Sequence, residues 1–363
     1  MSLFRDGVPP VLTNLRSKLL VSLGLGAMVM LGLTIYGDLP TMARTFGTFH
    51  WQYLPGILLL TLFNYLLRFV KWHYYLGLIG ARRISLRSSF LVFFSGLSMV
   101  ITPAKVGEWL KSFLLKQVNS TPISVSAPIV VAERLTDGMA MLLLAAVGLV
   151  VYAYAWEVLV LIFLASVAVL VIVQWRALAL RILAFGESLP IIAGRIESLH
   201  RFYESSYVLL RAKSLLLAIG IGVVSWFGEC VAFFLVLAGL GLPPSPTLLV
   251  QATFILAAST VIASVAFVPG GLAVAEGSIA GMLMLLNVTG EPAVAAAATL
   301  LIRLCTLWFG VAVGVGALLL LSREMASLAL LRGSRDASPA WQPGHDEAEQ
   351  EIQCQDNACA DDK

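Results

Sequence analysis

The chain has 363 residues, of which 59% are hydrophobic and only 12% are charged, and its mean hydropathy is +0.90. Soluble domains carry about 25% charged residues, so this composition argues against a soluble enzyme, a disulfide-rich secreted domain and a nucleic-acid-binding protein. Several apolar runs are long enough to cross a hydrocarbon core of roughly 30 Å. The sequence therefore predicts an all-α polytopic membrane protein.

The net charge of +3 averages two unlike parts of the chain. Residues 336–363 carry a net charge of −7, which leaves +10 for residues 1–335. Lys and Arg gather in cytoplasmic loops beside membrane spans, so we interpret the basic excess as a sign of topology. No basic stretch accompanies a recognisable nucleic-acid-binding module, so we expect no nucleic-acid partner.

The first elements in chain order are a short cytoplasmic N-terminus, 1–17, and a span at 19–36. We interpret this span as retained, because it is longer than a signal-peptide core and Gly37-Asp38-Leu39-Pro40 is no cleavage site. A second span, 53–71, ends in a loop that we expect to be cytoplasmic because of its basic residues. These residues are Lys71, Arg82, Arg83 and Arg87.

The next apolar segment, 88–102, is broken before a short helix at 107–118. That helix is too short and too charged to cross a bilayer, so we expect 88–118 to enter the membrane and return on the cytoplasmic side. Spans at 126–154 and 156–174 follow. The basic linker 175–213 is then expected in the cytoplasm, with an amphipathic helix on the membrane or under the bundle, or an ordinary connecting helix.

The second half begins with spans at 214–240 and 247–267. A break, a helix ending at 287 and a last span at 292–321 complete a membrane domain of residues 18–321. The segment 247–287 is either a hairpin entering from the outer side or two full crossings, and the loop charges do not distinguish these alternatives. We expect residues 322–363 to form a disordered acidic cytoplasmic tail, so that both termini are cytoplasmic.

Two breaks at matching positions indicate an internal repeat. The first contains Pro103 and Gly107-Glu108, and Arg134 follows Glu108 by 26 residues; the second contains Pro269-Gly270-Gly271 and Glu276, and Arg303 follows Glu276 by 27 residues. The expected topology makes these units, about 53–154 and 214–321, inverted repeats with one broken, re-entrant hairpin each. Paired broken segments of this kind mark the midplane site of transporters.

Ionisable residues recur around both breaks. Each costs several kcal/mol in an apolar helix unless it is paired or hydrated, so each is a functional candidate. The alternative is a set of structural ion pairs one helical turn apart, such as Arg134–Asp137 and Glu108–Lys111. Arginines among carboxylates suit a zwitterionic or anionic head group, because Arg forks onto phosphate. The set is Glu108, Lys111, Glu133, Arg134, Asp137, Glu229, Glu276 and Arg303.

Enzyme signatures are missing from the spans. No Ser/His/Asp set, P-loop, HExxH motif or paired metal-ligand cluster occurs there, so we expect neither catalysis nor a metal or cofactor. Without an ATP site, transport would be passive or ion-driven.

The motifs Thr102-Pro103-Ala104-Lys105-Val106-Gly107-Glu108, Val131-Ala132-Glu133-Arg134-Leu135-Thr136-Asp137 and Pro269-Gly270-Gly271-Leu272, with Glu276 and Arg303, are similar to one family. They resemble the flippase-like transmembrane domain of bacterial lysylphosphatidylglycerol synthases and its free-standing YbhN-like (UPF0104) relatives, over about 12–321. In the second motif Ala273-Val274-Ala275 separates Gly-Gly-Leu from Glu276, a departure from the family pattern. The resemblance implies lipid movement in a bacterial or archaeal cell membrane. It does not imply lipid synthesis, because the aminoacyl-transferase domain is missing.

The sequence thus favours a flippase-like transporter that moves a phospholipid or glycolipid head group between leaflets, with membrane lipids as partners. Lys105, Arg134 and Arg303 would hold phosphate, and Glu108, Glu133, Asp137 and Glu276 would balance charge or couple to protons.

Two alternatives stay open. An accessory protein for a lipid-glycosylating or lipid-synthesising enzyme, with a glycosyltransferase or other lipid-modifying enzyme as partner, would tolerate charge-neutral changes at Arg134 and Arg303. An intramembrane lipid-modifying enzyme would turn over a labelled lipid.

Overall fold

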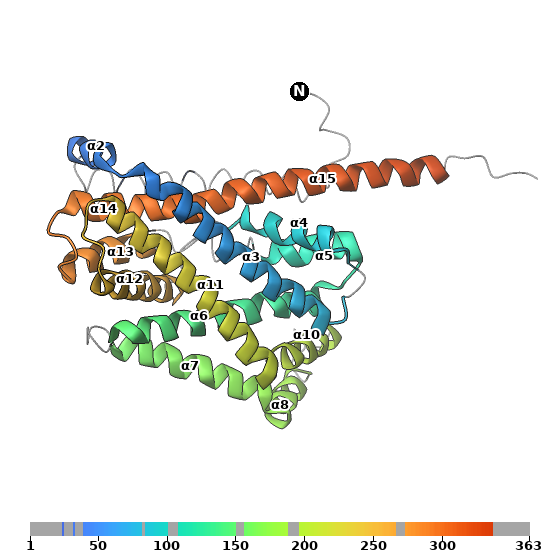
Figure 1. Cartoon of the computed structure of the whole chain (residues 1–363). Helices are drawn as coiled ribbons and strands as arrows, with labels where there is room; N and C mark the ends of the chain where they lie inside the picture. The colour runs from blue at the N-terminus through green and yellow to red at the C-terminus, as the bar shows by residue number, and fades with distance from the viewer. Residues whose placement is uncertain are drawn as a thin grey trace, which may run out of the picture. The chain divides into compact units, whose positions relative to one another are not determined.

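The computed structural model describes residues 39–81, 84–100, 108–149, 156–187, 196–265 and 273–336, together with Gly24 and Gly32. Every regular element in these ranges is a helix (Figure 1), which confirms the all-α prediction. The chain divides into two compact units, Met1–Leu319 and Leu320–Lys363. All of the site described below belongs to the first unit.

The first half of the membrane domain alternates long and short helices. Ser85 caps the short helix that begins at Leu86, because its side chain accepts a hydrogen bond of 3.0 Å from the backbone N–H of Ser88. The elements are α2 (Leu39–Thr48), η1 (Trp51–Tyr53), α3 (Leu54–Leu78), α4 (Leu86–Leu97), α5 (Leu110–Asn119), α6 (Ile123–Leu149) and α7 (Trp156–Gln174).

The linker expected at 175–213 contains two helices, α8 (Arg176–Glu187) and α10 (Ile196–Leu209). Helix α10 packs mainly on α6, with Leu209 fully buried, while Arg201 and Glu197 form an exposed ion pair on its other side. This arrangement fits an amphipathic helix that packs against the bundle.

The second half also contains both long and short helices. Proline opens both α12 and α14, where its missing N–H has no helical partner to lose. The elements are α11 (Ala212–Gly239), α12 (Pro246–Val265), α13 (Val274–Leu285), α14 (Pro292–Arg303), the π-helical segment η4 (Leu304–Trp308) and α15 (Phe309–Asp336). Helix α15 thus continues past residue 321, where the sequence placed the end of the membrane domain.

Four of the described helices are long and apolar enough to cross a membrane: Trp51–Leu78, Ala212–Gly239, Pro246–Ser264 and Pro292–Met325. They correspond to the expected spans at 53–71, 214–240, 247–267 and 292–321. The expected first span at 19–36 lies outside the described residues except for Gly24 and Gly32.

The predicted end of the second span, at residue 71, was wrong. Helix α3 continues to Leu78, so Lys71 lies inside a helix and is fully buried, not in a cytoplasmic loop.

Helices from the two halves pack directly on each other. The most extensive contacts join α3 to α11 and α6 to α12. Between α3 and α11, Asn64 Nδ2 donates to the carbonyl oxygen of Ser225 at 3.0 Å, and Ser225 Oγ donates to that of Asn64 at 3.3 Å. Figure 1 shows α3 and α11 running side by side, with α4 and α5 on one side of them and α12 and α13 on the other. In both halves a long helix is followed by a pair of helices and then by a further long helical segment, but the pair α4 and α5 is short, whereas α12 is membrane-length. The inverted relation of the halves stays a prediction.

Candidate functional site

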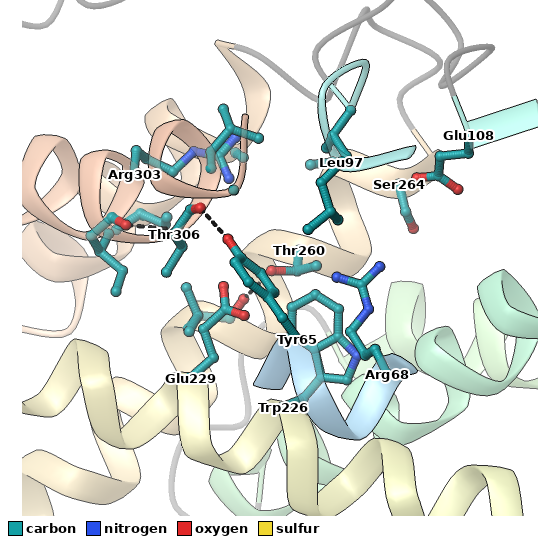
Figure 2. Close-up of a pocket in the computed structure, with 18 of the residues that line it drawn as sticks. Tyr65, Arg68, Leu97, Glu108, Trp226, Glu229, Thr260, Ser264, Arg303 and Thr306 are labelled. Atoms are coloured by element: carbon teal, nitrogen blue, oxygen red, sulfur yellow. Dashed lines mark hydrogen bonds between the residues drawn. The ribbon is translucent and has the colours of Figure 1, made fainter. Parts of the chain in front are cut away.

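A cavity of about 130 Å³, called the inner cavity below, lies among helices of both halves. Part of its lining comes from α3, α11, α12 and the α14–α15 segment, which are membrane-length and apolar, so charged side chains there are costly unless they are paired or hydrated. Its polar and aromatic lining comprises Tyr65, Arg68, Glu108, Arg134, Trp226, Glu229, Thr260, Ser264, Arg303 and Thr306 (Figure 2).

Glu108 and Arg134, which the sequence placed in the first repeat unit, meet at this cavity. Arg134 Nε lies 2.6 Å from Glu108 Oε2, which joins α6 to the turn before α5. The Glu108 side chain is 5% exposed, whereas that of Arg134 is 31% exposed. The Arg134 side chain is therefore the more exposed member of the pair, although its Nε atom is buried.

Glu276 and Arg303, the corresponding residues of the second unit, also form an ion pair, and this one is more deeply buried. Arg303 Nε donates to Glu276 Oε1 at 2.6 Å, and the side chains are 16% and 1% exposed. Glu276 lies in the first turn of α13, and Arg303 ends α14 directly before the π-helical segment. Among the described residues, Glu276 Oε2 has no hydrogen-bond partner.

Helix α3 supplies two basic residues that the sequence did not assign to the site. Lys71 pairs with the buried Asp137 and donates to Thr136 Oγ1 at 3.3 Å. Arg68 Nε lies 3.8 Å from Asp137 Oδ2, and its guanidinium lies 5.4 Å from the Trp226 ring centroid. The i,i+3 spacing of Arg68 and Lys71 puts both on one helix face. That spacing was the missed signal.

Glu133 belongs to a separate pair beside the cavity. It forms an ion pair with Lys111 of α5, and both side chains are almost fully buried. The Lys111 ammonium also lies 4.9 Å from the Trp72 ring centroid and 5.2 Å from that of Phe93. Glu133 and Lys111 thus fix α5 against α6 and α4, and neither borders the inner cavity.

Glu229 of α11 borders the inner cavity without a direct partner. No hydrogen bond or ion pair joins its carboxyl group to another described residue, although Arg68 and Arg303 interact with it electrostatically. Figure 2 shows this carboxyl group beside the ring of Tyr65, whose hydroxyl donates to the backbone carbonyl of Thr306. The sequence placed Glu229 among the buried charges but gave it no role.

The buried charges pair between helices. The two pairs offered as a purely local alternative, Arg134–Asp137 and Glu108–Lys111, are not the ion pairs that form in the described parts of the chain. Each of these residues instead joins a different segment, so the charges hold α3, α5 and α6 together around the cavity. The remaining predicted site residues, Pro103, Lys105, Gly107, Pro269, Gly270 and Gly271, lie outside the described residues.

A second hollow, called the side groove below, has a volume of about 490 Å³ and is partly open. It lies beside α6, between α7, α12 and the turn before α5. The lining residues used below are Glu108, Trp109, Arg134, Asp137, Gly138, Ile162, Ser166, Trp226, Thr260 and Ser264.

Within the described residues, no group of three or more His, Cys, Asp and Glu side chains could hold a metal ion. The carboxylates described above face basic side chains, with Glu229 lying apart, so this part of the molecule is suited to binding ionic groups.

A family model for the lysylphosphatidylglycerol synthase TM region matches residues 18–314. The chain belongs to this family. A relative described as a UPF0104 membrane protein, from Methanothermobacter thermautotrophicus (strain Delta H), is 26% identical over 235 residues, which cover 58% of this chain and 68% of the relative.

Membership confirms the resemblance inferred from the motifs. The matched range contains both Glu–Arg pairs, all of the helices from α2 to α14 and the start of α15. The protein is thus a membrane protein with several apolar helices, consistent with a multi-pass location. The region that defines this family is a membrane domain and not a catalytic domain.

Proposed function

We propose that the protein moves the head group of a phospholipid or glycolipid between membrane leaflets while the acyl chains stay in the bilayer. The observation that carries this proposal is the inner cavity, which combines Arg68, Arg134 and Arg303 with carboxylates among membrane-length helices. Buried ionisable groups are costly in a membrane. A cavity that retains them is suited to a charged ligand that must cross an apolar region.

The arginines provide the phosphate contacts in this proposal. Arg134 and Arg303 each contact a glutamate through Nε, and a guanidinium also carries donors on its two terminal nitrogens. Those donors can fork onto phosphate oxygens while the glutamate orients the side chain. Lys105 stays a third predicted contact.

The carboxylates balance the charge when no lipid is bound. Glu108 and Glu276 neutralise the two arginines, and Glu133 and Asp137 neutralise Lys111 and Lys71. Proton coupling through these groups, the inverted relation of the two halves and the cytoplasmic location of both termini belong to the same proposal. So does a bacterial or archaeal cell membrane as the site of action.

Reconstitution into liposomes tests the proposal. Lipids with fluorescent head groups are incorporated into both leaflets, and a membrane-impermeant reductant bleaches the outer leaflet. We expect bleaching to extend to inner-leaflet lipid only when the protein is present. Bleaching equal to that of empty liposomes, across anionic, zwitterionic and glycosylated lipids, would overturn the proposal.

Two variants separate transport from an accessory role. Arg134→Gln removes a charge from the cavity and should abolish translocation at unchanged expression, because phosphate loses its forked partner. Arg201→Gln removes the same charge from an exposed pair on α10 and should translocate like the wild type. If Arg134→Gln loses translocation in liposomes but keeps the function of the protein in cells, the accessory role is favoured. Full translocation by Arg134→Gln would instead overturn Arg134 as the phosphate contact.

A further inference from the structure

The side groove and the inner cavity meet at one ion pair. Glu108 and Arg134 border both, as do Trp226, Thr260 and Ser264. Arg303, in contrast, borders only the inner cavity. The Glu108–Arg134 pair therefore stands between a cavity of about 130 Å³ and a groove of about 490 Å³.

Helix α7 forms one wall of the side groove. Ile162 and Ser166 of α7 border the groove. Their neighbours Leu161 and Leu164 are 67% and 57% exposed. Large apolar side chains that are exposed on a membrane helix are suited to contact with lipid tails. The groove is partly open and is also lined by Trp109, whose side chain is 41% exposed, so it adjoins this apolar outer surface.

We infer that the side groove is the lateral entrance for the phosphate-bearing head group of a membrane lipid, and that the Glu108–Arg134 pair is the gate to the inner cavity. This inference rests on the proposed function. The head group first meets Arg134, the more exposed member of the pair. It then passes toward Arg68 and Arg303.

The lining of the groove fits this occupant. Arg134 offers forked donors for a phosphate group, and Ser166 and Thr260 add hydroxyl groups nearby. Trp109 and Ile162 add apolar surface for the glycerol part and the first carbons of the acyl chains. The volume of about 490 Å³ lies in the range of small-ligand sites.

Gly138 offers a direct test of the entrance. It borders the groove on α6, and an added Cβ would meet no atom within 4 Å. Gly138→Phe should therefore fill the groove without disturbing helix packing. The matched control is Gly220→Phe on α11, where an added Cβ also meets no atom within 4 Å and which borders neither cavity.

We expect Gly138→Phe to slow lipid translocation in liposomes about tenfold or more, since the barrier rises when the entrance is blocked. Gly220→Phe should stay close to the wild type. If the wild type translocates lipid and both variants match it, the side groove is not the entrance, while the proposed function stands. If the wild type translocates no lipid, the proposed function fails and the groove is judged by binding alone.

A thiol-labelling experiment measures binding without transport. Ser166→Cys is made in the full chain with Cys354 and Cys359 replaced by Ser, and Cys230 and Cys305 are buried. A water-soluble thiol reagent reports access to the groove in detergent micelles. Added phosphatidylglycerol should protect the thiol, whereas diacylglycerol and free glycerophosphate should not.

The arms of the labelling experiment distinguish the sources of phosphate. Protection by free glycerophosphate to the same extent would assign the groove to a soluble phosphate compound and overturn the lipid entrance. Equal protection by diacylglycerol would overturn the role of Arg134 as a head-group contact. A thiol that no lipid protects would overturn the entrance altogether.

Discussion

The two halves of the membrane domain contain the same Glu–Arg pair in different surroundings. In both, a glutamate at the start of the second hairpin helix contacts an arginine on the following helix, with Nε–Oε distances of 2.6 Å. In the first half, α6 also carries Glu133 and Asp137, which pair with Lys111 of α5 and Lys71 of α3. In the second half, Arg303 is the single charged residue of α14, and alanines occupy most of its buried face.

Exposure separates the two pairs. The Arg134 side chain is 31% exposed and borders both hollows, whereas that of Arg303 is 16% exposed and its partner Glu276 is 1% exposed. A repeated sequence motif has thus produced one accessible arginine and one enclosed arginine. The first is suited to receiving a ligand from outside the site. The second is suited to holding a ligand, or the helices themselves, deep in the bundle.

Loss of the enclosed arginine should have the largest effect. Arg303→Ala leaves the Glu276 carboxylate buried without its partner, which should lower the free energy of unfolding by about 3–5 kcal/mol. Arg134→Ala should cost about 1–3 kcal/mol, because solvent reaches that pair more easily. Unfolding in mixed detergent and dodecyl sulfate micelles measures both.

The double variant Arg303→Leu with Glu276→Leu is the control for the buried pair. It removes both charges, so it should recover most of the stability lost in Arg303→Ala. Equal losses of unfolding free energy for Arg303→Ala and Arg134→Ala would show that the difference in exposure does not distinguish the two halves.

Two glycines show how each half packs against the other. A Cβ at Gly314 of α15 would collide with the backbone of Leu97 and Ser98 after α4, whereas one at Gly148 of α6 would collide with the Phe254 side chain of α12. The Phe254 atoms nearest to Gly148 are Cβ and Cγ, which are held by the backbone and move little more easily than backbone atoms. Gly314→Ala and Gly148→Ala should therefore each lower the free energy of unfolding by about 1–3 kcal/mol.

The control in this series is Gly316→Ala, since an added Cβ there meets no atom within 4 Å. It should be neutral or slightly stabilising, because Ala favours helix more than Gly does. Thermal unfolding of the three variants in one detergent gives the order. A loss at Gly314 or Gly148 no larger than that at Gly316 would contradict the close packing of the two halves at that glycine.

Exchanging each arginine for lysine tests which one receives the ligand. Arg134→Lys keeps the charge but loses the fork, so translocation should fall about tenfold, equivalent to roughly 1.4 kcal/mol. Arg303→Lys should fall less, because Arg303 borders only the inner cavity. Arg201→Lys on α10 is the control and should be unchanged. The opposite order would assign the receiving role to the second half.

The fold was largely predictable because apolar length is a strong signal. The spans at 214–240, 247–267 and 292–321 correspond to membrane-length helices, and the helix at 156–174 has the predicted bounds. The error at Lys71 arose because a basic residue beside an apolar run is ordinarily a loop residue. Only its partner Asp137, 66 residues away, shows that it belongs inside α3.

The site was predictable where charges follow a repeated spacing. The sequence indicated Glu108, Arg134, Glu276 and Arg303 together, and the structure pairs them as two matching contacts. It could not indicate that Glu133 turns toward Lys111 and away from the cavity, because helical spacing leaves the neighbouring helix unspecified. For the same reason Arg68 was missed and Glu229 had no assigned place.

Glu229 should have the smallest effect on stability of all the charged residues at the inner cavity. None of the described basic residues loses an ion-pair or hydrogen-bond partner when Glu229 becomes Gln, so the free energy of unfolding should change by less than about 1 kcal/mol. Glu276→Gln, in contrast, weakens the contact of Arg303 and should be clearly destabilising. Both can be measured by unfolding in mixed micelles.

Although Glu229→Gln should barely change stability, it should clearly change lipid translocation. Its carboxyl group lies in the cavity without a direct partner, so its charge is available to a head group or a proton and not committed to holding helices together. Glu229→Gln should therefore alter the preference between zwitterionic and anionic lipids at unchanged stability. If Glu229→Gln unfolds as easily as Glu276→Gln, Glu229 has a structural role like that of Glu276. The proposed difference between the paired Glu276 and the unpaired Glu229 would then be wrong.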